Sequence, residues 1–212
     1  MPNWHPVSIR QLLYAESMTA PESLWTRSRR AAHAEITAVA MGLFLEQGFD
    51  ETTIDQIALT AGISRRSFFR YFGTKEDIVL GDLARQGPVV RDALEAVPET
   101  VGPWDALRDA FNAVKVFDDD PELTLKISRM MYETPTLRAR SIEKHLHWQS
   151  LLVPNIRQRL GIDRDDETNP SADAIVASAI ACLDVAGEVW TRSGGTLDLA
   201  ALYEQAALAV RG

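Results

Sequence analysis

The sequence contains very little cysteine and no long apolar run, and each shortage excludes a class of structure. Cys182 is the single cysteine among 212 residues, so neither an intrachain disulfide nor a multi-cysteine metal site can form. We expect Cys182 to be a small buried hydrophobe. The most apolar stretch, Ile175 to Leu183, is too short to cross a bilayer, and no signal peptide is recognisable. These features predict a cytoplasmic protein with no metal, no cofactor and no membrane contact.

Sequence motifs typical of enzymes are also missing. The chain has no glycine-rich phosphate loop, no nucleophile elbow and no His-Glu-x-x-His motif. His145 and His147 lie two positions apart, so they cannot share one face of a helix. We therefore expect no enzymatic activity, although catalysis is one alternative to the interpretation developed below.

The charged residues are distributed unevenly. A net charge of -8 argues against nucleic acid as a partner, because phosphate neutralisation needs lysine and arginine. Up to Lys75, however, the chain carries eight basic and seven acidic residues, and seven of the basic ones fall between Arg27 and Arg30 or between Arg65 and Lys75. The remainder has a net charge of -9. This asymmetry predicts a small DNA-facing head on an acidic body.

Apolar residues recur at helical spacing almost throughout, which predicts an all-α fold. We expect a three-helix head over residues 25–75 and a larger helical body over residues 76–212, with six or so helices. Residues 1–24 are expected to form a flexible extension, which is either a disordered arm or a leader before a native start at Met18. Proline, glycine or clustered acidic residues predict breaks in the body at Gly87-Pro88, Pro98 to Pro103, Asp118 to Pro121, Pro135, Gly161 to Pro170 and Gly194-Gly195.

The first helix is expected from about Arg27 to Gln47, with Gly48 ending it. Its apolar stripe consists of Ile36, Val39, Ala40, Leu43 and Phe44.

The segment from Thr53 to Ser64 has the signals of a helix followed by a sharp turn. Thr53 and Gln56 have the spacing of a capping box, which predicts a helix start at Thr53. Gly62 can adopt the left-handed conformation that the turn needs, and Ser64 can cap a second helix. Ile54, Ile57, Ala58, Ala61 and Ile63 are expected to pack inward.

The second helix, from Ser64 to Phe72, combines arginines, a hydroxyl and aromatic rings. Phe68 and Phe72 are four residues apart and are expected in the core. Arginine can bind guanine bidentately, serine can bond a base edge or a phosphate, and an aromatic ring can pack on a thymine methyl. The helix that Lys75 opens offers N–H groups to a phosphate. The residues expected to contact DNA are Arg29, Arg30, Thr53, Ser64, Arg65, Arg66, Ser67, Phe69, Tyr71 and Lys75.

Composition alone allows two other interpretations of this basic helix. A pair of arginines on a helix is most often a solvated face, and here only the capped helix, the glycine turn and the serine cap together favour DNA. A helical interaction module, whose basic helix meets an acidic protein, is the second alternative.

The segment from about Ala32 to Leu80 resembles the N-terminal domain of TetR-family transcriptional regulators. One position departs from the family pattern, because tyrosine usually stands where this chain has Phe69, so a hydroxyl contact to phosphate is lost. The head, with Gly87-Pro88 and Val97-Pro98, is also similar to the mycofactocin and AcrR-like branch, which is thought to sense acyl-type or other lipophilic molecules. The matching features are Gly42-Leu43-Phe44, Gln47-Gly48-Phe49, Thr52-Thr53, Ile57-Ala58, Ala61-Gly62-Ile63-Ser64, Phe69-Arg70-Tyr71-Phe72 and Lys75-Glu76.

This resemblance implies a homodimer of nine- or ten-helix subunits, in which the last two helices of each subunit form a four-helix interface. It implies that Arg65, Arg66, Ser67, Phe69 and Tyr71 contact the operator and that Lys75 contacts a phosphate. It also implies an effector pocket in the middle of the C-terminal domain. The expected function is a repressor that binds a palindromic DNA operator and is released by a small lipophilic effector.

The apolar residues of the body give candidates for both the interface and the pocket. The alternative for the interface set is a single wide core face, and for each pocket residue it is ordinary core packing. We expect the dimer interface to contain Ile175, Val176, Ala179, Ile180, Leu183, Leu199, Leu202, Tyr203 and Ala206. We expect the ligand pocket to contain Trp104, Phe111, Met130, Met131, Tyr132, His145, Trp148, Leu152 and Trp190.

Overall fold

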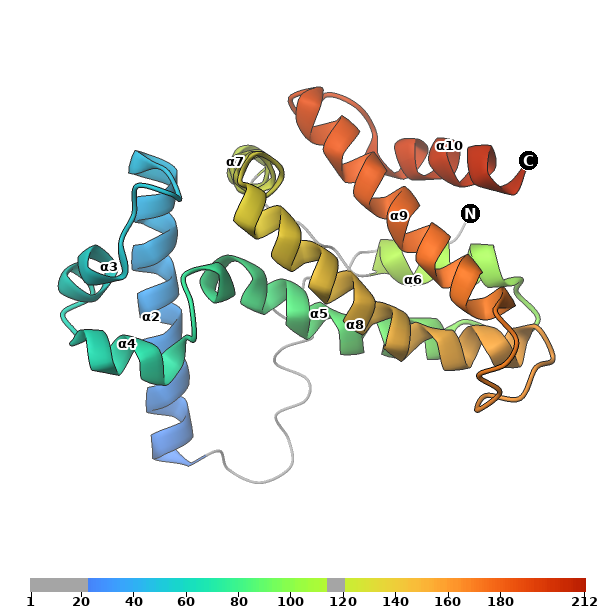
Figure 1. Cartoon of the computed structure of the whole chain (residues 1–212), viewed down its shortest axis with the longest axis horizontal. Coiled ribbons are helices and arrows are strands. Elements are labelled where there is room, and N and C mark those ends of the chain that lie inside the picture. The colour runs from blue at the N-terminus through green and yellow to red at the C-terminus, as the bar shows by residue number, and fades with distance from the viewer. Residues whose placement is uncertain (1–22, 114–120) are drawn as a thin grey trace, which may run out of the picture.

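The computed structural model describes residues 23–113 and 121–212, apart from the side chains of residues 82–85 and 121. These parts contain helices and no strand, which confirms the all-α prediction (Figure 1). The predicted extension 1–24 and the choice between Met1 and Met18 fall almost wholly outside the described residues. The helices are α2 (Leu24–Gln47), α3 (Ile54–Thr60), α4 (Arg65–Tyr71), α5 (Glu76–Ala96), α6 (Pro103–Ala113), α7 (Pro121–Glu133), α8 (Pro135–Arg159), α9 (Ser171–Arg192) and α10 (Leu199–Arg211).

The head consists of α2, α3 and α4, and its caps are those that the sequence indicates. Thr53 Oγ1 accepts a hydrogen bond from the Gln56 N–H at 3.2 Å, while Gln56 Oε1 accepts from the Thr53 N–H at 2.8 Å, so the capping box is complete. Gly62 has φ +66° at the turn, and Ser64 Oγ caps α4. The start of α2 was predicted at Arg27, and it is three residues earlier because Ser23 Oγ accepts from the Thr26 N–H.

The hydrophobic core of the head is shared with the body. Phe68 is 0% exposed at its centre, and Ile36, Phe44 and Phe72 surround it. The same cluster includes the first turn of α5 (Ile78, Val79 and Leu80) and Leu137 of α8. The functional head is therefore larger than the predicted segment 25–75, since part of its core comes from residues beyond Lys75.

The body is built around α9, which packs against α6, α7, α8 and α10. Six helices follow Lys75 in the described parts of the chain, as predicted. The run Ile175 to Leu183 was judged too short to cross a bilayer, but the helix that contains it, Ser171–Arg192, is long and apolar enough to do so by length and composition. The core helix of a soluble protein passes the same test, and Val176 and Ala179 are both 0% exposed in the core of the body.

One predicted break in the body is wrong. Gly87 and Pro88 lie inside α5, which runs unbroken from Glu76 to Ala96. The glycine serves a long-range contact, because a Cβ at this position would lie 3.0 Å from both Trp148 and Leu151 of α8. Gly87 thus allows two helices to approach each other closely. The breaks at Pro98 to Pro103, Pro135, Gly161 to Pro170 and Gly194-Gly195 separate helices as predicted, whereas the break at Asp118 to Pro121 falls almost wholly outside the described residues.

A single arginine fastens the end of α5 to α8. The Arg159 guanidinium donates to the carbonyl oxygens of Leu94, Pro98, Val97 and Val101 at 2.7–3.1 Å. Its Nε donates to Asn155 Oδ1 at 2.8 Å. All five N–H groups of the guanidinium are therefore engaged, and four of them bond carbonyls at the C-terminal end of α5 and in the loop that follows it.

Candidate DNA-binding surface and ligand-binding body

The turn between α3 and α4 places the start of α4 on the outside of the head. The Ile63 N–H donates to the Ala58 carbonyl at 2.9 Å, which closes the turn, and Phe68 anchors α4 from beneath. Arg65, Arg66 and Phe69 are exposed as a result. This geometry is a helix-turn-helix, in which the second helix presents its N-terminal residues to a groove of DNA.

The two arginines of α4 have different surroundings. Arg65 Nη1 forms a salt bridge with Asp55 of α3 at 2.9 Å, and its guanidinium lies 5.8 Å from the centre of the Phe69 ring. Within the described residues Arg66 makes no salt bridge, and its side chain is exposed. Arg66 can therefore reach a base or phosphate at no internal cost, whereas Arg65 must first leave Asp55.

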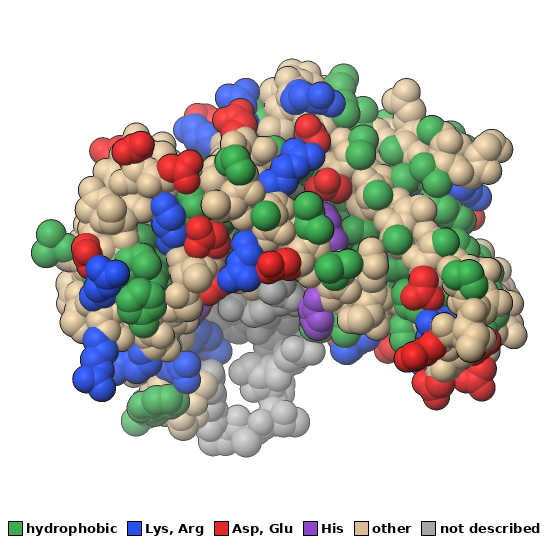
Figure 2. All heavy atoms as spheres, in the orientation of Figure 1, with side chains coloured by type: hydrophobic (Ala, Val, Ile, Leu, Met, Phe, Trp, Pro, Cys, Tyr) green, Lys and Arg blue, Asp and Glu red, His purple; other side chains and the backbone are tan. Residues whose placement is uncertain are grey.

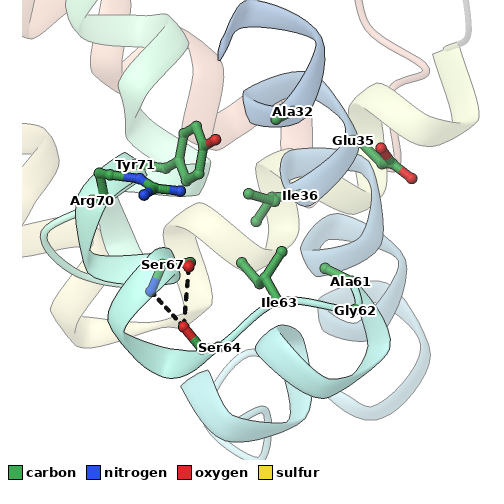
Figure 3. A pocket seen from close by; sticks show the side chains of 10 residues that line it. All are labelled: Ala32, Glu35, Ile36, Ala61, Gly62, Ile63, Ser64, Ser67, Arg70 and Tyr71. Carbon is green, nitrogen blue, oxygen red and sulfur yellow. Dashed lines mark hydrogen bonds between the residues drawn. The ribbon is translucent and has the colours of Figure 1, made fainter. Parts of the chain in front are cut away.

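A groove between α2 and the helix-turn-helix is lined by a candidate DNA contact that the sequence does not single out. It has a volume of about 370 Å³ and a floor that includes Ile36 and Ile63 (Figure 3). Arg70 and Tyr71 line one side, and the Arg70 guanidinium lies 5.3 Å from the centre of the Tyr71 ring. Arg70 is exposed on the same helix as Arg66, so it belongs with the candidate DNA contacts. Its position four residues after Arg66 is a signal that could have identified it.

The contacts of the Lys75 side chain differ from the phosphate contact that the sequence predicts. Its Nζ donates to the carbonyl oxygens of Phe49, Asp50 and Thr52 at 2.7, 3.3 and 3.2 Å, and it lies 4.3 Å from the centre of the Phe49 ring. The three ammonium donors are thus directed at the loop between α2 and α3. We revise its assignment from a phosphate contact to a residue that fixes this loop.

Carboxylates of the chain itself lie at the predicted phosphate site at the start of α5. Asp77 Oδ2 accepts from the Thr74 N–H at 2.9 Å, and Glu76 adds a second acidic residue to the first turn. Carboxylates at a helix N-terminus already complement its dipole, so a phosphate would meet like charge there.

Basic residues gather on the head, and acidic ones gather at the far end of the body (Figure 2). Arg29 and Arg30 lie on the first turns of α2, where the side chains are exposed, and Arg29 lies 5.6 Å from the centre of the Trp25 ring. Thr53, Ser64 and Ser67 also lie on the head, but their side-chain oxygens take part in helix capping or its hydrogen bonds. The basic and acidic residues that are separated along the sequence are therefore also separated in space.

Most of the predicted pocket residues are packed in the hydrophobic cores of the body and the head. Phe111, Trp148 and Leu152 belong to the body core and are 6%, 2% and 0% exposed. Trp104 packs against that core, and Trp190 packs on Gly195. Met130 and Met131 pack instead against the head core. The assignment of these residues to a ligand pocket stays a prediction.

A small cavity of about 80 Å³ lies where α7, α8 and α9 meet. It is lined by Tyr132 and Met131 from α7, Arg138 and Ser141 from α8, and Asp184 from α9, among others. Tyr132 Oη donates to the Asp184 carbonyl at 3.1 Å, and burial raises the pKa of the Tyr132 phenol. Two of the predicted pocket residues, Met131 and Tyr132, line this cavity.

Lys144 and His145 bring two titratable groups to the body side of α8. Burial lowers the pKa of Lys144 to about 8, opposed by the charge of Asp184. Burial, and secondly the charge of Lys144, lower the pKa of His145 to about 4. His145 also meets the Trp148 ring edge-on, with 6.4 Å between ring centres. Cys182 is buried as predicted, and burial raises the pKa of its thiol, which is the opposite of a redox-sensing cysteine.

The lowered pKa of His145 predicts a pH-dependent stability that His145→Gln removes. Between about pH 6.5 and 4 the unfolded chain binds a proton at His145 and the folded chain does not, so stability falls as the pH falls through this window. Over this pH window we expect the free energy of unfolding of His145→Gln to fall by about 1 to 2 kcal/mol less than that of the wild type. Urea unfolding at a series of pH values measures it. His147→Gln, at an exposed position two residues away, is the control and should follow the wild type. Parallel curves for His145→Gln and wild type would contradict the prediction.

The predicted dimer residues turn inward. Val176, Ala179, Ile180 and Tyr203 are buried in the core of the body, and the other five (Ile175, Leu183, Leu199, Leu202 and Ala206) pack against it. Helical spacing found a real apolar stripe, but that stripe covers the subunit's own core. The outward faces of the last two helices carry other apolar residues, among them Val185, which is 52% exposed, and Leu208, which is 62% exposed.

Comparison with known proteins identifies both parts of the chain. Residues 36–81 match the family model of bacterial regulatory proteins of the tetR family, and residues 101–211 match that of the MftR C-terminal domain. The second match confirms the resemblance to the mycofactocin branch. It also assigns more than half of the chain, including the body whose sequence alone gave only a weak signal.

Individual relatives agree with this assignment. TcmR, an HTH-type transcriptional regulator of Streptomyces glaucescens, is 30% identical over 189 residues, which cover 86% of this chain and 83% of TcmR. A protein of Mycobacterium tuberculosis named MftR, for regulation of mycofactocin biosynthesis, is 32% identical over 141 residues, covering 66% of this chain and 71% of MftR. FadR of Thermus thermophilus, a repressor solved with lauroyl-CoA, has the same fold, with a TM-score of 0.57 at 23% identity over 82% of this chain and 91% of FadR. The chain is therefore a member of the TetR family of transcriptional regulators.

Proposed function

We propose that the protein is a ligand-responsive repressor that binds a palindromic DNA operator as a homodimer in the cytoplasm and leaves it when a small lipophilic effector binds. The observation that carries the proposal is the capped helix-turn-helix, which exposes Arg65, Arg66 and Arg70 on one short helix. FadR, which was solved with lauroyl-CoA, supports an acyl-type effector. The rival interpretation, a module that binds an acidic protein, would use the same basic helix.

The dimer surface in this proposal is the outward face of α9 and α10. Apolar side chains recur there at seven- and four-residue steps, which gives one stripe on each helix. Pairing of these stripes between two subunits would form a four-helix interface and would remove exposed Val185 and Leu208 from water. The stripe residues are Ala174, Ala181 and Val185 on α9 and Ala201 and Leu208 on α10.

Effector binding acts on DNA through the shared head core. Met131 lies both against that core and on the wall of the cavity with Tyr132, so a change in α7 reaches the head directly. Arg140 of α8 lies 3.6 Å from Asp77 at the start of α5, which ties the body to the head a second time. A ligand that separates the body helices would shift the spacing of the two recognition helices away from about 34 Å and release the operator.

Operator binding is tested with the purified full-length protein and DNA from the promoter region of its own gene. We expect a retarded complex at low salt, lost as salt rises and lost with a scrambled sequence. Lauroyl-CoA is the first effector to add, and release of the operator is the expected result. If no fragment is bound at low salt, the protein-interaction alternative replaces this proposal.

Replacement of Arg66 by alanine should weaken operator binding more than replacement of Arg65. Arg66 has no salt bridge to break within the described residues, whereas part of any contact by Arg65 is offset by the loss of its bond to Asp55. We expect about 1 to 3 kcal/mol for Arg66→Ala, measured by fluorescence anisotropy on the operator. Equal losses on operator and random DNA would mark Arg66 as a phosphate contact, and an undiminished affinity would remove it from the interface.

A further inference from the structure

Lys144 places a positive charge against the core of the body without an acidic partner. Its Nζ lies 4.8 Å from the centre of the Trp148 ring. The described parts of the chain offer it no carboxylate within salt-bridge distance, although Asp184 acts on it from further away. Removing an ammonium from water is unfavourable unless it is paired. The position of Lys144 therefore suits a partner that the described residues do not provide.

Two further buried polar atoms, one on α8 and one on α5, lack hydrogen-bond partners in the described structure. Trp148 is 2% exposed, and its Nε1 has no acceptor. The indole packs on Gly87, where a Cβ would lie 3.1 Å from Nε1. Gln86, the preceding residue of α5, has a buried Oε1 that accepts no hydrogen bond. A buried polar atom without a hydrogen-bond partner destabilises the fold, so atoms left in this state point to a ligand.

The Lys144 site, as we call Lys144 with the Trp148 ring beneath it, adjoins apolar side chains of the body core. Phe111 stacks with Trp148, with 6.5 Å between ring centres, and Leu152 is fully buried in the same core. His145 is neutral near pH 7 because its pKa is lowered. Lys144 thus places a cation beside aromatic and aliphatic surface, which matches a ligand with an anionic group on an apolar body.

We propose that the effector carries a carboxylate on an apolar chain or ring system, and that Lys144 binds this carboxylate. The Trp148 indole N–H can donate to a further oxygen of the ligand, and Gln86 Oε1 can accept from a ligand hydroxyl. The apolar part of the effector packs on Phe111 and Trp148. This inference rests on the proposed function, since it assigns the chemistry of the same effector.

The experiment compares two pairs of ligands that differ only in charge, dodecanoate with dodecanol and naphthoate with naphthylmethanol. Binding to the full-length protein is followed by tryptophan fluorescence and calorimetry. We expect at least one acid to bind tenfold or more tightly than its alcohol. Lys144→Met should remove this preference by weakening the acid, with the alcohol unchanged. Lys126→Met is the matched control on the exposed side of α7 and should behave like the wild type, since Lys126 pairs with Glu122 there.

Several outcomes separate this inference from the proposed function. Thermal unfolding of Lys144→Met should show a folded protein, because a buried charge is replaced by an apolar chain of similar length. Equal binding of acid and alcohol in both pairs, no binding of either acid, or a preference that survives in Lys144→Met would each overturn the inference. Operator binding without ligand is measured in parallel, and its loss would instead overturn the proposed function.

Discussion

Replacement of Arg159 by alanine should lower the free energy of unfolding by about 3 to 5 kcal/mol. The side chain donates five hydrogen bonds, four of them to carbonyl oxygens at the end of α5 and in the loop that follows. Without the guanidinium, the Leu94 and Pro98 carbonyls keep only the N–H groups of Val97 and Val101, and the link between α5 and α8 is lost. Guanidinium chloride unfolding measures the effect. Such a loss is a large fraction of the stability of a typical domain.

Two control variants make the Arg159 prediction specific. Arg159→Lys keeps the charge but has three donors without the planar fork, so an intermediate loss is expected. Arg164→Ala removes a neighbouring arginine whose contact to Glu95 is 3.8 Å and largely exposed, and it should cost less than about 0.5 kcal/mol. If Arg159→Ala unfolds at the same denaturant concentration as the wild type, the carbonyl network contributes no net stability.

Replacement of Lys75 by methionine should destabilise the head by about 2 to 3 kcal/mol and thereby reduce operator binding. The ammonium holds the loop between α2 and α3 through three carbonyl oxygens and lies over the Phe49 ring. Methionine keeps the length of the side chain and loses every one of these contacts. The measurements are thermal unfolding and operator affinity at several salt concentrations.

The salt dependence decides between a structural and a phosphate-binding role for Lys75. In the structural role, the fraction that remains folded binds DNA with the slope of the wild type. A phosphate contact would instead leave the melting temperature unchanged and reduce the salt slope by about 1. Arg66→Met serves as the control, because an exposed arginine should weaken binding without a change in stability.

Local chemistry made the head predictable. Thr53, Gln56, Gly62 and Ser64 act on backbone groups within a few residues, so their spacing alone indicates the caps and the turn that the structure shows. The roles of Lys75 and Arg159 depend on carbonyl oxygens more than twenty residues away. A single sequence holds no signal for such contacts, and a basic residue near a helix end is ordinary in itself.

The body was predictable in outline only. A helix that is apolar on most of its faces does not reveal which stripe meets its own core. Four residues of the predicted interface set on α9 and α10 are buried in that core, and the other five are half-buried against it. Gly87 was interpreted as a helix break because a glycine followed by proline is a common stop signal, and only the position of Trp148 shows why that glycine is there. The residues of the head are enough to indicate the family, whereas the body is assigned to it by its similarity to known proteins.

The shared head core limits how this protein can be recombined with others. A chimera that joins its DNA-reading head to a foreign sensor at residue 75 would leave behind Ile78, Val79 and Leu80, which complete the packing around Phe68. Even a later junction would lose Leu137, which comes from α8 far along the chain. An exchangeable module would need the first turn of α5 together with a sensor whose α8 offers a leucine at the equivalent place. Evolution of new ligand specificities on this scaffold is under the same restriction, since the body can vary freely only away from that contact.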